Sequence, residues 1–214
     1  MMDMDEARPV MARASIYGLS ALAFTYPEDQ TVDDIRDGVS TLAEALGLAG
    51  SRPETVETGL AFGEAVQATP PSVIRRNYNE FFVGRKQCRL DESEYDESIF
   101  NRQQRLADAA GFYRAFGFEL AGDAYQRADF VGTELEFMHV VLIKHAYALE
   151  QGWDDQAEAC KDAEGKFLSE HLEWWIPAMC EKLRGASTCA FYRSLSHFLE
   201  SFIRSEASEY PQPA

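Results

Sequence analysis

The stretch of sequence that decides the fold runs from Asp129 to Leu149 and reads DFVGTELEFMHVVLIKHAYAL. Mostly apolar side chains recur along it in alternating steps of four and three residues, at Val131, Leu135, Met138, Leu142, His145 and Leu149. This spacing places them on one face of an α-helix. Asp129 stands at the position of a helix cap and Gly152 follows the periodic run, so the sequence predicts one long helix between these two residues.

The same helical period extends outward through most of the chain. Further stripes of apolar residues begin at Val10, Ile35, Leu106 and Phe191, and proline or glycine residues separate them. No alternation typical of a β-strand is longer than four residues. The sequence therefore predicts an all-α protein, a helical bundle of about eight to ten helices.

Three segments of the chain fall outside these predicted helices. Residues 84–98 form a long loop, and residues 117–128 form a break that is a candidate hinge. Residues 208–214 end in Pro-Gln-Pro-Ala and are expected to be a disordered tail.

The composition excludes several classes of function. The chain has 214 residues, with 20 Lys and Arg against 36 Asp and Glu, which gives a formal net charge of −16. Such an acidic balance disfavours binding to nucleic acid or to an anionic membrane. The four cysteines form no CxxC pair, and the sequence shows no signal peptide or membrane span. A cytoplasmic protein with reduced thiols is therefore expected.

The common catalytic motifs are missing from the sequence, and neither a cofactor site nor a metal site is predicted. There is no GxSxG, GxGxxG, HExxH or phosphate-binding loop. Glu136 and His139 form one ExxH pair, whereas a di-iron bundle needs two such pairs and two further glutamates. A surface glutamate beside a half-buried histidine is the favoured interpretation, and a helical metal-dependent enzyme built on this pair is the alternative.

The loop at 84–98 carries five acidic residues within seven positions, Asp91, Glu92, Glu94, Asp96 and Glu97. Two interpretations are open: a solvated run of charge, or a docking surface whose carboxylates pair with the guanidinium groups of a cationic peptide. Tyr78, Phe81 and Phe82 directly precede the loop. An aromatic groove beside an acidic rim would suit a basic peptide that also carries an apolar stretch.

Four segments of the chain, taken in order, resemble those of a known family. They are Tyr78–Gly84 (YNEFFVG), Asp129–Met138 (DFVGTELEFM), Phe167–Leu172 (FLSEHL) with the following Trp175 and Pro177, and Phe191–Leu195 (FYRSL). They resemble segments of the cytoplasmic chaperones that mature molybdenum enzymes, the TorD, DmsD and NarJ type.

The resemblance implies a single all-helical domain at 1–207 that is not an enzyme. Chaperones of this type are expected to bind the precursor of a molybdenum oxidoreductase catalytic subunit, through its twin-arginine leader or its apo form, before cofactor insertion and export. A permanent accessory subunit of a redox complex is a further alternative. The oligomeric state that the resemblance implies is a monomer or a domain-swapped dimer.

The resemblance also implies where the leader binds. Carried over to this sequence, the site falls on Tyr78, Phe81, Phe82, Asp129 and Phe130, with Glu134 on the same predicted helix. Many members of the family have a histidine where this sequence has Phe130, so a more apolar pocket is expected here.

Overall fold

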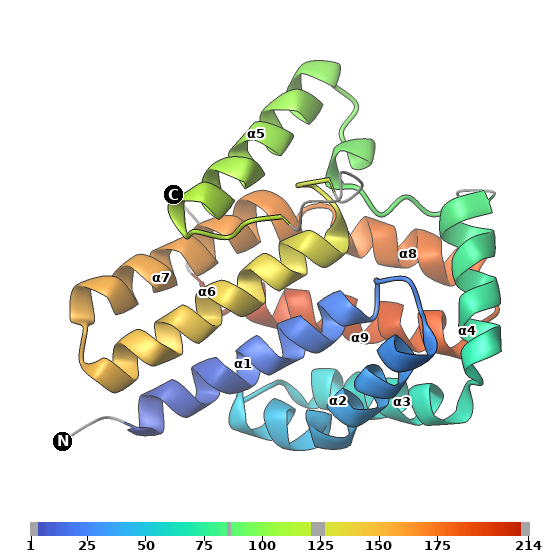
Figure 1. The fold of residues 1–214 in the computed structure, drawn as a ribbon, viewed down its shortest axis with the longest axis horizontal. Coiled ribbons are helices and arrows are strands. Elements are labelled where there is room, and N and C mark those ends of the chain that lie inside the picture. The colour runs from blue at the N-terminus through green and yellow to red at the C-terminus, as the bar shows by residue number, and fades with distance from the viewer. Residues whose placement is uncertain (1–3, 85–86, 121–126, 211–214) are drawn as a thin grey trace.

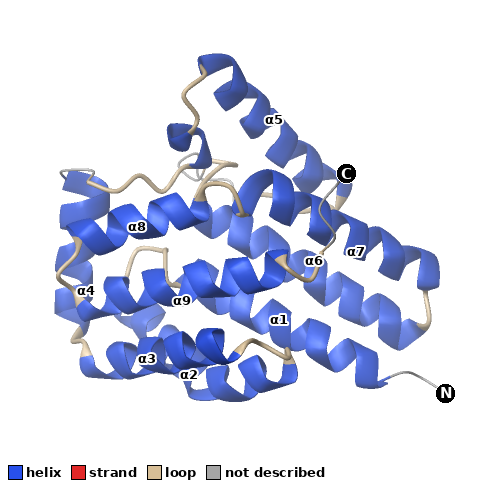
Figure 2. Ribbon diagram, turned by 180° about the vertical axis from the view of Figure 1, so that it is seen from behind, coloured by secondary structure: helices blue, strands red, loops and turns tan. Residues whose placement is uncertain are grey.

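The computed structural model describes residues 4–84, 87–120 and 127–210 of the chain. Nine α-helices account for most of these described residues. Their bounds are α1 (Met4–Leu22), α2 (Asp29–Leu48), α3 (Pro53–Ala68), α4 (Pro71–Tyr78), α5 (Ile99–Ala115), α6 (Val131–Gln151), α7 (Asp154–Phe167), α8 (Ile176–Ala186) and α9 (Ala190–Ala207). Figure 2 shows helices and loops, and no strand in this described part, so the prediction of an all-α fold is confirmed.

Three short helical segments join the longer helices. η1 (Asn79–Gly84) and η3 (Leu168–Leu172) are π-helices that continue α4 and α7, and η2 (Glu92–Tyr95) is a 3₁₀-helix before α5. Pro177 stands in the first turn of α8, where its missing N–H costs no hydrogen bond. The proline therefore stands at the start of a new helix after η3.

α6 lies at the centre of the fold and carries the predicted stripe. Val131, Leu135, Met138 and Leu142 are fully buried, and His145 is nearly so. α1 packs along α6 over most of its length, and the two helices lie side by side in Figure 1. α6 ends at Gly152, whose φ of 67° is the left-handed conformation that glycine adopts without a steric penalty.

The remaining helices cover this central pair. α2 packs against α1 and α3, while α9 packs against α3 and α8, and α7 returns along α6. α5 projects away from this body in Figure 1. Part of its contact with the body is aromatic, since Phe112 lies edge-on to Phe167 at 5.3 Å and to Phe137 at 6.2 Å between ring centroids.

Parts of the predicted loop, hinge and tail lie outside the described residues, namely residues 85–86, 121–126 and 211–214. Tyr210, which belongs to the predicted tail, packs against the body. Its hydroxyl donates to Glu164 Oε2 at 2.7 Å and accepts a hydrogen bond from Arg13. Order therefore extends at least to Tyr210.

Within the described residues, none of the helices combines the length with the apolar character that a membrane crossing would require.

Candidate functional site

Residues 91–97, which carry the five acids and are called the acidic segment, run beside the start of α6. The N–H of Val131 donates to the carbonyl of Leu90 at 2.8 Å, and the N–H of Glu92 donates to the carbonyl of Asp129 at 2.8 Å. Asp91 and Phe130 form an isolated antiparallel bridge between these two bonds. Backbone hydrogen bonds thus hold the acidic segment against the start of the resembling segment Asp129–Met138.

Asp129 is fully buried and does not cap α6, which corrects the expectation from the sequence. Phe130 occupies the cap position, and its side chain makes no capping hydrogen bond. The carboxylate of Asp129 instead accepts the N–H of Ser93 at 3.2 Å and the Nε–H of Arg127 at 2.9 Å. Because the carboxylate binds that guanidinium, it raises the pKa of Arg127.

Glu92 is also fully buried, although it belongs to the acidic run. Its carboxylate accepts hydrogen bonds from Trp174 Nε1 at 2.8 Å and from His171 Nδ1 at 3.1 Å, and it lies 3.4 Å from a guanidinium nitrogen of Arg105. These partners hold the side chain inside the protein, so Glu92 is not part of an exposed docking surface. η2, which carries it, replaces the middle of the predicted loop.

The other acids of the run divide between paired and free positions. Asp96 forms an ion pair with Arg105 at 2.9 Å, and the N–H of Ser98 donates to its carboxylate at 3.0 Å, which lowers its pKa. Asp91 is half-buried, and burial beside the charge of Asp129 raises its pKa. Glu97 is exposed and Glu94 is partly exposed. Glu94, Glu97 and one face of Asp91 are therefore the carboxylates that this segment offers to solvent.

Glu134 lies beneath this surface rather than on it. It is fully buried, and its Oε2 accepts a hydrogen bond from Trp175 Nε1 at 3.2 Å. Burial raises its pKa well above the usual range, and the nearby carboxylates of Glu92 and Asp129 raise it further. Glu134 therefore belongs to the support of the site, not to a surface that meets a peptide.

The predicted aromatic residues separate into a surface row and a core residue. Tyr78 and Phe82 are half-buried and lie edge-on at 5.1 Å between centroids, whereas Phe81 is buried. The row continues outward to Tyr26, at 5.4 Å from Tyr78, and ends inward on Tyr192, which is fully buried and lies 5.2 Å from Phe82. Tyr26, 43% exposed, was missed from the sequence because it stands alone before Pro27, far from the other aromatics.

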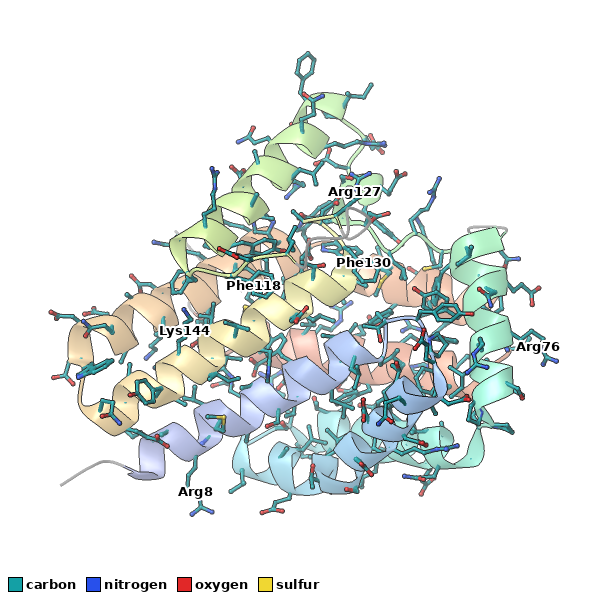
Figure 3. All side chains as sticks on the ribbon, in the orientation of Figure 1. Arg8, Arg76, Phe118, Arg127, Phe130 and Lys144 are labelled. Atoms are coloured by element: carbon teal, nitrogen blue, oxygen red, sulfur yellow. The ribbon has the colours of Figure 1, made fainter. Side chains whose placement is uncertain are left out.

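A hollow of about 410 Å³ lies between α1, α2 and the start of α6. Its lining is largely small or apolar, and includes Gly18, Leu19, Leu22, Thr25, Gly38, Phe130 and Gly132. The exposed acids Asp34 and Glu136 also line this hollow. Thr25 borders the hollow and Tyr26, the next residue, begins the aromatic row, so the two features adjoin. Figure 3 shows Arg127 and Phe130 at this N-terminal end of α6, below α5.

His139 borders the same hollow and has a structural partner. Its Nδ1 lies 2.8 Å from the carbonyl oxygen of Ala14, and since a carbonyl only accepts, this nitrogen carries the proton. Glu136 points to solvent. His139 is half-buried, and among the described residues no third potential metal ligand gathers with this pair.

Known proteins with similar sequences add independent information. The profile of the family described as nitrate reductase delta subunit matches residues 29–181. The perchlorate reductase assembly chaperone protein of Dechloromonas aromatica is 24% identical over 208 residues, or 93% of this chain and 90% of the relative. The chlorate reductase assembly chaperone protein of Ideonella dechloratans is 30% identical over 119 residues, or 52% and 60%. Chaperone protein TorD of Photobacterium profundum is 22% identical over 190 residues, or 89% and 78%.

All three relatives are named as chaperones. Because the family profile covers more than half of the chain, the chain belongs to the nitrate reductase delta subunit family. The family resemblance seen in the sequence is therefore confirmed.

Proposed function

We propose that this protein is a cytoplasmic chaperone for the catalytic subunit of a molybdenum-containing oxidoreductase. It binds the precursor, including its twin-arginine leader, until the cofactor is inserted and the subunit is exported. The observation that carries the proposal is the relation to the perchlorate reductase assembly chaperone, which extends over 93% of the chain. By the same relation, the client is an oxidoreductase of the perchlorate or chlorate reductase kind.

The surface geometry supports a leader-binding role. A twin-arginine leader offers two guanidinium groups followed by an apolar stretch. The hollow beside Phe130 and the exposed parts of Tyr26, Tyr78 and Phe82 provide apolar surface for that stretch. Exposed carboxylates stand on both sides, Asp34 and Glu136 at the hollow and Glu94 and Glu97 on the acidic segment. Because exposed ion pairs contribute little, the apolar contacts supply most of the affinity and the acids supply orientation.

Calorimetric titration of the purified chain with the client's synthetic leader peptide tests this proposal. The matched ligand is the same peptide with both arginines replaced by glutamine, and a scrambled apolar stretch provides the second control. Saturable one-to-one binding that weakens with both changes supports the proposal. Equal heats for all three peptides would show that the chain does not recognise the leader.

The family description favours a second candidate, a permanent accessory subunit, because it names a subunit rather than a chaperone. The two candidates differ in the form of the enzyme that they bind. An accessory subunit stays with the processed, cofactor-loaded enzyme, whereas a chaperone leaves it. Gel filtration of the mature enzyme with the purified chain separates the two, since only an accessory subunit co-elutes.

A further inference from the structure

A buried cluster of three polar side chains lies under the acidic segment. Glu92 comes from η2, Glu134 from α6 and His171 from η3, and their exposed fractions are 0%, 0% and 2%. One donor atom from each residue lies within 4.8 Å of the donor atoms of the other two. The cluster therefore joins three elements that are far apart in the sequence.

Two atoms of this cluster have no hydrogen-bond partner among the residues that the structure describes. They are Oε1 of Glu134 and Nε2 of His171. Buried polar atoms in folded proteins are nearly always satisfied, because leaving one unpaired forfeits its hydrogen bonds to water without replacing them. Either a proton shared between Glu134 and the neighbouring carboxylate of Glu92, or a bound cation, would satisfy Oε1 of Glu134, and Nε2 is the nitrogen of His171 that keeps a lone pair.

The charges of the cluster point to a cation. Glu92 is paired with Arg105, and the adjacent Asp129 with Arg127. For Glu134, by contrast, the described residues provide no ion pair with a basic side chain. An ionised carboxylate buried without a counter-charge is costly, so Glu134 requires either a proton or a metal ion.

We propose that Glu92, Glu134 and His171 form a binding site for one divalent transition-metal ion, such as Zn²⁺, Mn²⁺ or Fe²⁺. One imidazole nitrogen with two carboxylate oxygens is a donor set that these ions accept, whereas Ca²⁺ and Mg²⁺ prefer oxygen alone. Metal–ligand distances of about 2.0–2.2 Å place opposite ligands about 4.4 Å apart, so small side-chain rotations bring the three donors into range.

The surroundings of the cluster fit this role. Trp174 donates to Glu92 and Trp175 donates to Glu134, and such outer partners fix the orientation of ligating carboxylates. His171 sits in a π-helix, a distortion that is frequent at functional sites. The aromatic ring of Phe167 stacks on His171 at 4.7 Å and excludes water from that side. The bound ion would tie η2 to α6 and η3, and this role does not depend on leader binding.

Metal loading of the purified full-length chain tests the site. The protein is stripped with a chelator, incubated separately with Zn²⁺, Mn²⁺ and Fe²⁺, desalted, and analysed for bound metal and for its melting temperature. We expect one equivalent of at least one metal and a higher melting temperature. Glu134→Gln and His171→Ala should each weaken metal binding about 100-fold or more, since even the loss of an outer partner costs about 10–100-fold.

Matched variants separate this site from others on the chain. Glu136→Gln with His139→Ala changes the ExxH pair on the same helix and should leave metal binding unchanged. Glu134→Gln keeps the shape of the buried side chain, so it remains informative if His171→Ala fails to fold. The absorption spectrum of Co²⁺-loaded protein identifies thiolate ligands. No stoichiometric metal, metal binding that survives Glu134→Gln, or a thiolate spectrum would each overturn the proposal, the first showing that Glu134 holds a proton.

Discussion

Asp129 holds Glu92 in place through the backbone: the carbonyl of Asp129 accepts the N–H of Glu92 at 2.8 Å. The carboxylate of the same residue accepts the next N–H, that of Ser93, at 3.2 Å. Asp129 therefore holds the backbone of the acidic segment in place, and this structural role is separate from any contact with a ligand. A substitution at Asp129 that weakens leader binding must be separated from a loss of this support.

Replacement of Asp129 should show how much this residue contributes to the stability of the fold, apart from any part in leader binding. Asp129→Ala leaves the buried N–H of Ser93 unsatisfied, and we expect it to lower the free energy of unfolding by about 1–3 kcal/mol. Asp129→Asn retains an oxygen acceptor and should cost less. Denaturant unfolding measures both variants. Equal stability of the wild type and Asp129→Ala would show that the segment is held without this carboxylate.

Phe82→Ala should weaken binding of the leader peptide at least about tenfold, because the half-buried Phe82 contacts Tyr78 in the aromatic row and aromatic contacts dominate peptide interfaces. Tyr147→Ala is the matched control, since Tyr147 is 50% exposed near the opposite end of α6. Calorimetry gives the affinities, and circular dichroism verifies that both variants keep their helix content. A loss of equal size in both variants would place the site elsewhere.

Leader affinity should fall as salt concentration rises, since a chain of net charge −16 attracts a basic leader and salt screens exposed charges. Two double variants locate the effect. Asp34→Asn with Glu136→Gln removes charge at the hollow, and Glu94→Gln with Glu97→Gln removes it from the acidic segment. The double variant that removes the carboxylates in contact with the leader's arginines should make leader affinity depend less on salt concentration. An affinity of the wild type that does not change with salt contradicts an acidic rim.

Gly18→Ala tests whether the hollow beside Phe130 is used. An added methyl group would lie 2.9 Å from Nδ1 of His139 and would push this ring out of place. We expect a loss of stability of about 1–3 kcal/mol from overpacking, together with weaker leader binding. Gly47→Ala is the control, because a methyl there meets nothing within 4 Å. Unchanged affinity of a folded Gly18→Ala protein would remove the hollow from the site.

The buried thiol of Cys88 should make the free energy of unfolding decrease as the pH rises through the alkaline range. Burial raises its pKa to about 11 from an ordinary value of 9.0. The folded state thus keeps the proton between these values while the unfolded chain releases it, so stability falls as pH rises from about 9 to about 11. This contribution, on the order of 2 kcal/mol, should vanish in Cys88→Ala. Denaturant unfolding curves at the two pH values measure this contribution. An equal loss of stability in Cys88→Ala and in the wild type would contradict the prediction.

Local periodicity predicted the helices well because their packing depends on local spacing. The stripe from Val131 to Leu142 is buried as the alternating steps require. The break at Pro177 and the end at Gly152 follow equally from properties of single residues.

The positions of Glu92 and Asp129 depend on residues far away in the sequence. Local spacing therefore gave the wrong expectation for their burial and their partners. Glu92 looks like one of five solvated acids, yet His171 and Trp174, which lie 79 and 82 positions along the chain, supply its buried partners. Asp129 has the type and position of a helix cap, but Ser93 and Arg127 bind its carboxylate instead. Such competition between local and tertiary partners is not visible in spacing.

Affinity purification of the tagged chain from its own cells, followed by mass spectrometry, tests the central claim most directly. Cells are grown under conditions that induce molybdenum oxidoreductases, and the Phe82→Ala protein is purified in parallel. The account predicts that a catalytic subunit co-purifies with its twin-arginine leader still attached, and that it is depleted with Phe82→Ala. Recovery of only the processed, cofactor-loaded subunit, or of no oxidoreductase at all, would contradict the account.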